Sequence, residues 1–144
     1  MQEPLMRQLP AEYRPLLNKF YRSHRSHMRA PADACYWVAG APEIVAGLCL
    51  VSVEGGKWLT GLLVAPSHRG CGLATGLLSR AMAACEGYVW LFCEPGLMRF
   101  YQQLGFSLAP TLPESLASRF ERYNRHKTLV AMRYHSEITC PTKP

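Results

Sequence analysis

The stretch Val64-Ala65-Pro66-Ser67-His68-Arg69-Gly70-Cys71-Gly72-Leu73-Ala74 joins a strand-like apolar run to a helix-like apolar run. Its second half, residues 69–74, fits the pattern Arg/Gln-x-x-Gly-x-Gly/Ala. Glycines at a strand-to-helix turn let the backbone approach a ligand closely, and the first amides of a helix have no partner within it. Those amides and the positive end of the helix dipole favour an anion, so the turn predicts a site for a pyrophosphate.

Three short apolar runs before this turn predict strands. They cover residues 34–39, 44–53 and 58–64. The segments between them are short and rich in glycine or proline, which is typical of the turns in an antiparallel meander. We therefore expect three sequential strands that lead directly into the glycine turn.

Upstream of the meander, the sequence predicts a first strand over residues 3–8 and then a helix. The helix begins at Pro10, a residue that suits a first helical turn, and ends near His24. Its apolar residues recur at helical spacing and are Tyr13, Leu16, Leu17, Phe20 and Tyr21. The polar, basic residues 23–33 predict either a loop or a short second helix.

Downstream of the turn, helices and short strands alternate. Leu73, Leu77, Leu78, Ala81 and Cys85 mark one face of a helix that ends near Gly87. A second helix begins at Pro95 and is closed by Gly105, in the position of a left-handed C-cap, and a third begins at Pro113. The expected strands in this half cover residues 88–93, 106–109 and 128–134.

The resulting order, β-α-β-β-β-α-β-α-β-α-β, predicts an α/β fold with a mixed, mostly antiparallel central sheet flanked by helices. With 144 residues, we expect a single domain over residues 1–135 and a flexible tail over residues 136–144. No apolar run is long enough to cross a bilayer, and the first residues lack the pattern of a signal peptide. We therefore expect a cytoplasmic protein without a membrane partner, either a monomer or a homodimer.

The six cysteines include no C-x-x-C pair and no His/Cys cluster with the spacing of metal ligands, so no metal site is expected. Most of them lie in apolar runs, where cysteine is usually a small core residue with a reduced thiol. Cys71 differs because it lies in the glycine turn. A helix N-terminus lowers a thiol pKa, and the alternative is a small residue tolerated in a tight loop.

The net charge of +6 is concentrated in two segments, residues 19–29 and 119–127. Such clusters attract polyanions, among them a phosphorylated cofactor, and the alternative is a solvated basic face. Binding of nucleic acid would depend on this charge alone, because no nucleic-acid-binding motif accompanies it.

The turn at residues 69–74 and the string Arg99-Phe100-Tyr101-Gln102-Gln103-Leu104-Gly105-Phe106 together resemble the GNAT N-acetyltransferase superfamily. The second string is similar to that family's frequent FYxxLGF segment. A helix and a strand separate the two motifs, and a meander precedes them, as in the family. The resemblance covers about residues 1–135. It implies an enzyme that moves the acetyl group of acetyl-CoA to a primary amine by direct attack in a ternary complex.

The resemblance also implies how the co-substrate binds. Backbone amides across the turn would hold the pyrophosphate, through Arg69, Gly70, Cys71, Gly72, Leu73 and Ala74. The end of the preceding strand, Leu62, Leu63 and Val64, would offer backbone hydrogen bonds to the pantetheine arm, as if the arm were an added strand. Gly61 is a candidate for the β-bulge that splays this strand from the next one, or for a glycine that permits close packing.

Two side chains are candidates for the chemistry. Tyr101 matches the tyrosine that protonates the departing thiolate in many family members; the alternative is a packed aromatic residue. The strand glutamate that many members use as a base is missing, because residues 57–64 contain no carboxylate. Glu94 ends the strand 88–93, where ligands gather in α/β sheets, and would order a water or the amine. It is alternatively an acid stabilised by a helix N-terminus. His68 and His135 are weaker candidates, and a neutral amine would need no base.

The acceptor is an amine on a small molecule or a macromolecule. In the family, the first helix with its loop and the connection before the last strand wall the acceptor pocket. These are the two basic segments here, so an acidic acceptor is expected. The competing interpretation is a non-catalytic module that binds acetyl-CoA and regulates a partner protein. The missing strand glutamate favours that interpretation, whereas Tyr101 argues for the enzyme.

Overall fold

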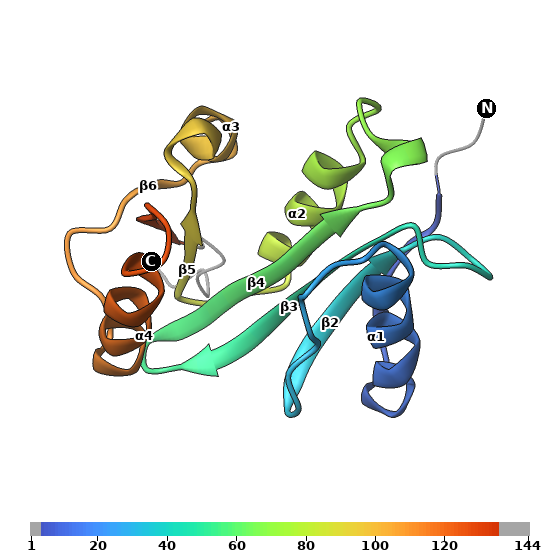
Figure 1. The fold of residues 1–144 in the computed structure, drawn as a ribbon, viewed down its shortest axis with the longest axis horizontal. Helices are drawn as coiled ribbons and strands as arrows, with labels where there is room; N and C mark the ends of the chain where they lie inside the picture. Colours follow the sequence, from blue (N-terminus) through green and yellow to red (C-terminus); the bar gives the residue numbers. More distant parts are fainter. Residues whose placement is uncertain (1–3, 136–144) are drawn as a thin grey trace, which may run out of the picture. The chain divides into compact units, whose positions relative to one another are not determined.

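Strands and helices alternate in the order that the sequence predicts (Figure 1). The computed structural model describes residues 4–135, and the tail expected over residues 136–144 lies outside them. In chain order the elements are β1 (Met6–Leu9), α1 (Arg14–Ser23), β2 (Ala34–Ala39), β3 (Ala46–Val53), β4 (Gly56–Val64), α2 (Leu73–Ala83), β5 (Tyr88–Cys93), α3 (Met98–Gln103), β6 (Ser107–Leu108), α4 (Glu114–Asn124) and β7 (Val130–His135). The fold is therefore α/β, with a seven-stranded sheet of order β1-β2-β3-β4-β5-β7-β6.

Two helices begin later than the proline pattern predicts. A single 3₁₀ turn, η1 (Ala11–Tyr13), follows Pro10, and α1 starts only at Arg14. In the same way η3 (Pro95–Leu97) precedes α3. Proline suits the first turn of either helix type, because it lacks the N–H that would be unpaired there. It therefore marks the start of the helical segment without deciding when the wider α-helical turns begin.

The segment between α1 and β2 is a loop, which decides between the two alternatives for residues 23–33. Arg25, just after the end of α1, has a φ of 57°. A non-glycine residue in the left-handed region is uncommon and cannot continue a right-handed helix. The basic residues of this segment thus lie on a loop.

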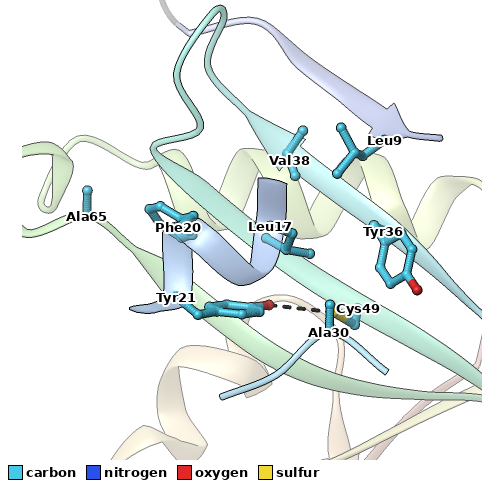
Figure 2. Packing of buried hydrophobic residues seen from close by; sticks show 9 residues of the cluster. All are labelled: Leu9, Leu17, Phe20, Tyr21, Ala30, Tyr36, Val38, Cys49 and Ala65. Carbon is cyan, nitrogen blue, oxygen red and sulfur yellow. Dashed lines mark hydrogen bonds between the residues drawn. The ribbon is translucent and has the colours of Figure 1, made fainter. Parts of the chain in front are cut away.

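The described chain forms two compact units, of which the first comprises residues 4–51 and Leu59–Ala81. In this unit β1 pairs with β2 and β2 with β3, both antiparallel. Helix α1 buries Leu17, Phe20 and Tyr21 against these strands (Figure 2). The approach is close, because a Cβ added at Gly47 on β3 would lie 2.7 Å from Leu17 Cδ1. Glycine at this position lets the helix and the sheet pack together.

The second unit comprises Ser52–Trp58 and residues 82–135. Its strand β5 pairs in parallel with the start of β4 over Gly56–Trp58, and antiparallel with β7 along its whole length. Aromatic side chains fill the space between β5 and α4, with the rings of Phe92 and Phe120 centred 5.0 Å apart. The guanidinium of Arg119 on α4 lies 4.6 Å from the ring centroid of Trp58. Long-range packing of aromatic residues therefore holds this unit together.

Candidate functional site

The glycine turn is an open stretch of backbone at the start of α2. Gly70 and Gly72 have φ values of +81° and +80°, a conformation that side-chain-bearing residues rarely adopt. A Cβ added at either glycine would meet no atom within 4 Å. The carbonyl of Gly72 accepts the first helical hydrogen bond, from the amide of Gly76 at 3.0 Å. The amides of Leu73, Ala74 and Thr75 precede this bond and have no partner within the helix. This surface of bare backbone at a positive helix end fits a pyrophosphate.

Side chains of the turn bind the turn's own backbone. Arg69 Nε donates to the carbonyl oxygen of Val64 at 3.0 Å, and Cys71 Sγ donates to that of His68 at 2.9 Å. His68 Nδ1 in turn lies 3.0 Å from Ser67 Oγ. These contacts hold the turn against the end of β4, so Arg69 connects the two segments that the sequence assigns to the coenzyme. The thiol of Cys71 is exposed and has a structural contact within the turn.

The end of β4 is shaped by a glycine and by a tyrosine from α1. Gly61 has a φ of +72°, and a Cβ there would lie 2.6 Å from Tyr21 Oη. The Tyr21 hydroxyl donates to the Gly61 carbonyl at 2.7 Å. The close-packing alternative for this glycine is therefore confirmed, because the tyrosine hydroxyl packs on it, and the β-bulge stays a prediction. The regular strand geometry is interrupted just before Leu62, Leu63 and Val64.

The Tyr21 hydroxyl keeps its proton because it is buried. Burial and, to a lesser degree, Cys49 raise the pKa of Tyr21 far above its usual value. Its single proton is donated to Gly61, so the thiol of Cys49, 3.5 Å from Tyr21 Oη, is the donor in their contact (Figure 2). In the sequence Tyr21 is one of several apolar residues at helical spacing, and no local pattern indicates the partner of its hydroxyl.

Tyr101, in the second unit, is held by the end of its own helix. Gly105 has a φ of +101°, and the amides of Gly105 and Phe106 donate to the carbonyls of Gln102 and Tyr101 at 3.1 Å each. This pair of bonds is a Schellman motif, and the rings of Phe106 and Tyr101 form the hydrophobic contact that accompanies it, with centroids 5.7 Å apart. The string from Phe100 to Phe106 thus encodes a helix stop that anchors Tyr101.

The phenol of Tyr101 is neutral at physiological pH. The residue is only 7% exposed, and its ring also stands edge-on to Phe100 at 5.0 Å. Burial and, to a lesser degree, the neighbouring Cys93 raise the pKa of Tyr101 to about 12. A protonated phenol at this position is a hydrogen-bond donor and a weak acid.

Glu94 follows β5 and lies on the surface. Its carboxylate Oε2 is 3.3 Å from Lys127 Nζ, and both side chains are 60% exposed. The backbone of Glu94 precedes η3, but its side chain makes no capping hydrogen bond there. The structure therefore pairs this acid with a lysine of the second basic segment. Within the second unit Glu94 and Tyr101 follow the same strand, whereas residues 62–74 belong to the first unit.

Contacts within the protein use several of the remaining polar candidates. Arg119 Nη1 lies 3.4 Å from the Tyr123 hydroxyl, and Arg122 lies over the Tyr123 ring. His135 packs against Tyr88, with ring centroids 4.6 Å apart. Part of the second basic segment is thus engaged in structural contacts.

Across residues 4–135, no cluster of three or more His, Cys, Asp or Glu side chains has the arrangement of a metal site. No helix within the same residues has the length and hydropathy needed to cross a membrane.

Comparison with known proteins agrees with this description. The model of the acetyltransferase (GNAT) family matches residues 3–106, more than two thirds of the chain. None of the curated proteins compared with the sequence matches it. The fold is similar to that of Escherichia coli ElaA, with a TM-score of 0.69 and 14% identity over 92% of this chain and 99% of that one.

Two further solved structures are similar at comparable identity. An acyl-CoA N-acyltransferase from Pseudomonas aeruginosa has a TM-score of 0.65 and 17% identity, over 90% of this chain and 98% of its own. N-acetylglutamate synthase from Neisseria gonorrhoeae, complexed with coenzyme A and N-acetyl-glutamate, has a TM-score of 0.64 and 12% identity. That match covers 94% of this chain and 36% of the synthase chain. At these identities the likeness describes the fold.

Proposed function

Because the chain belongs to the GNAT acetyltransferase family and is thus an acyltransferase that uses a coenzyme A thioester, we propose that it transfers acetyl from acetyl-CoA to a primary amine. The attack is direct, in a ternary complex of enzyme, acetyl-CoA and amine. The observation that carries this proposal is the open turn at Gly70 and Gly72, which leads into the amides of α2. Acetyl-CoA supplies an activated acyl group, and the protein supplies binding and orientation.

The two segments of the first unit divide the binding of the coenzyme. The backbone amides from Gly70 to Ala74 hold the pyrophosphate, and the backbone at Leu62–Val64 pairs with the pantetheine arm. Of the three carbonyls at the end of β4, that of Val64 already accepts from Arg69 Nε. The arm therefore uses the backbone groups of Leu62 and Leu63 first. Fixing the thioester in one place makes the attack effectively unimolecular, which is a large rate advantage for such a site.

Tyr101 holds a proton at Oη and donates it toward the sulfur that leaves. A phenol with a pKa of about 12 is a weaker acid than a thiol, whose pKa is about 8.5. The hydrogen bond from Tyr101 therefore stabilises the departing thiolate. The proton passes fully to the sulfur as the attacking nitrogen, which becomes positively charged, gives one proton back to the phenol. Glu94 is the proposed acceptor, through a water, of the earlier proton that an ammonium form loses before it attacks, and an amine that arrives neutral does not need Glu94.

The test is the release of thiol from acetyl-CoA in the presence of a broad panel of primary amines. We expect turnover with at least one amine and formation of its N-acetyl product, identified by mass spectrometry. The Glu94→Gln variant should lose the acid limb of the pH–rate profile, while Glu86→Gln, an exposed control outside the proposed site, should keep it. An unchanged profile in Glu94→Gln removes Glu94 from the mechanism.

A second candidate is a non-catalytic module that binds acetyl-CoA and regulates a partner protein. The absence of a carboxylate from Gly56–Val64 favours it. It requires tight binding of acetyl-CoA, no turnover with any amine of the panel, and a protein that copurifies. We also propose a cytoplasmic protein with one domain over residues 1–135, in keeping with the buried free thiols of Cys49 and Cys93.

A further inference from the structure

A cavity of 340 Å³ lies in the first unit, at the surface beside α1. It is formed by β1, by α1 and by the loop between β2 and β3. The lining side chains used below are Arg7, Lys19, Phe20, Glu43 and Ile44. Its volume is at the lower end for a ligand pocket, which suits a small molecule.

The polar lining carries both signs of charge. Arg7 and Lys19 are cations from two different elements, and Glu43 is an acid from the loop. Among residues 4–135, Glu43 makes no ion pair of 4.0 Å or less with either cation. Arg7 Nη2 donates to the carbonyl of Gly40 at 3.2 Å, which ties the guanidinium to the loop and leaves its other donors for a ligand. The cavity thus offers separate partners for an anion and for a cation.

The apolar lining of the cavity belongs to a buried cluster that extends to the end of β4. Phe20 is only 4% exposed and belongs to the buried cluster that also includes Ala65, and Ile44 and Leu63 pack against the same cluster. The loop is bonded directly to this strand end, because the Ala65 amide donates to the Val45 carbonyl at 2.8 Å. Figure 2 shows Phe20 and Ala65 among the side chains of this cluster. The loop that lines the cavity is therefore joined to the end of β4, the strand proposed to hold the pantetheine arm.

We propose that this cavity holds the acceptor and that the acceptor is a small amino acid or a similar amino-carboxylate. This inference depends on the proposed acetyltransferase function. The carboxylate binds Lys19 and Arg7, the ammonium group binds Glu43, and the carbon skeleton rests on Phe20 and Ile44. Glu43 would repel a dianion that carries no ammonium group, and the two cations would repel a polyamine. A molecule with one charge of each sign satisfies all three groups.

The reaction of such an acceptor balances as follows. The nitrogen forms a bond to the acetyl carbon as the bond from that carbon to sulfur breaks. The ammonium group loses two protons, of which one reaches the sulfur of coenzyme A and the other reaches solvent. Glu43 binds the ammonium form, and the amine attacks after its first proton has left.

The test compares each of the twenty amino acids with the amine that lacks its carboxylate. We expect KM to be at least about fivefold lower for the preferred amino acid than for its decarboxylated counterpart. The Lys19→Gln variant should raise KM for the amino acid by about fivefold, leave kcat and the KM for acetyl-CoA unchanged, and leave the decarboxylated amine unaffected. Lys19→Arg should restore the KM. Glu43→Gln should raise KM for both acceptors, because both carry the ammonium group.

The matched control is Arg80→Gln, which removes an exposed cation from the last turn of α2 outside the cavity. It should change neither the KM for the amino acid nor the KM for its decarboxylated counterpart. Turnover that prefers the decarboxylated amines, or that is unaffected by Lys19→Gln and Glu43→Gln, would overturn the cavity assignment and leave the acetyltransferase function intact. If no amine is acetylated, isothermal titration with the amino acids decides the matter. If an amino acid binds and Lys19→Gln weakens that binding, the cavity assignment is supported although the proposed function fails. If no amino acid binds, the cavity assignment is overturned.

Discussion

The glycine turn before α2 and the packed segment around Tyr101 are built in opposite ways. At Gly70 and Gly72 the backbone is exposed, and no atom occupies the space where a side chain would be. Tyr101 is buried between aromatic rings, and its backbone carbonyl is bonded to the amide of Phe106. The first region presents main-chain groups to a ligand, whereas the second positions one hydroxyl through the packing of its ring. A substitution in the turn should therefore affect binding, and one at Tyr101 should affect the rate.

The largest expected effect is that of Tyr101→Phe on the rate. We expect kcat to fall by about 100-fold or more, because the group that donates to the sulfur is lost. The phenylalanine ring preserves the contacts with Phe100 and Phe106, so the melting temperature and the affinity for coenzyme A should change little. Steady-state kinetics and calorimetric titration measure these quantities. Tyr13→Phe, at a tyrosine that is 48% exposed, is the control. A rate within twofold of wild type would make Tyr101 a packing residue.

The same tyrosine should also make the protein less stable in alkali. Its pKa is 10.0 in the unfolded chain and about 12 in the folded protein, so the folded state keeps a proton that the unfolded chain releases. This stability is fully present below pH 10 and is lost as the pH rises toward 12. This difference of two pKa units contributes about 2.7 kcal/mol to the free energy of unfolding. Urea unfolding should show that the free energy of unfolding falls less between pH 9 and pH 11 in Tyr101→Phe than in wild type. Equal falls would contradict the assigned pKa. Gly72→Ala should show the wild-type loss, because it leaves Tyr101 unchanged.

Tyr21→Phe should lower the free energy of unfolding by about 1–2 kcal/mol, because it leaves the Gly61 carbonyl without its donor. The changed backbone at the end of β4 should also weaken binding of coenzyme A. This variant separates the shape of the strand from the chemistry of the turn, because residues 69–74 are untouched. Denaturant unfolding and calorimetric titration with coenzyme A provide the two measurements. If stability falls and the affinity does not, Gly61 has a purely structural role.

Gly72→Ala should have the smallest effect, about 1 kcal/mol or a fivefold loss of coenzyme A affinity. The added methyl group strains a backbone with a φ of +80° and covers part of the open surface. Gly96→Ala is a matched control, because that glycine also has open space around it but lies in η3 and has no positive φ. Isothermal titration with coenzyme A compares the two variants. Equal affinities would mean that the pyrophosphate does not bind over Gly72.

The sequence predicted the element order because each step of it has a local cause. Glycines at Gly72 and Gly105 permit backbone conformations that other residues resist, and the apolar runs between them have helical or strand spacing. The boundaries were less accurate: the first strand was expected over residues 3–8 and lies at Met6–Leu9. A boundary depends on where hydrogen bonds to a neighbouring strand begin, and a single strand does not contain that information.

What the sequence by itself determined is the family, the turn before α2 and the helix stop that carries Tyr101. All three are encoded in residues that lie next to one another in the chain. Only the tertiary structure decided that Tyr21 bonds to Gly61, 40 residues away, that Lys127 pairs with Glu94, and that Arg7, Lys19 and Glu43 line one cavity. The physical reason is that these contacts join separate elements. Their residues come together only when hydrophobic burial has packed helix against sheet.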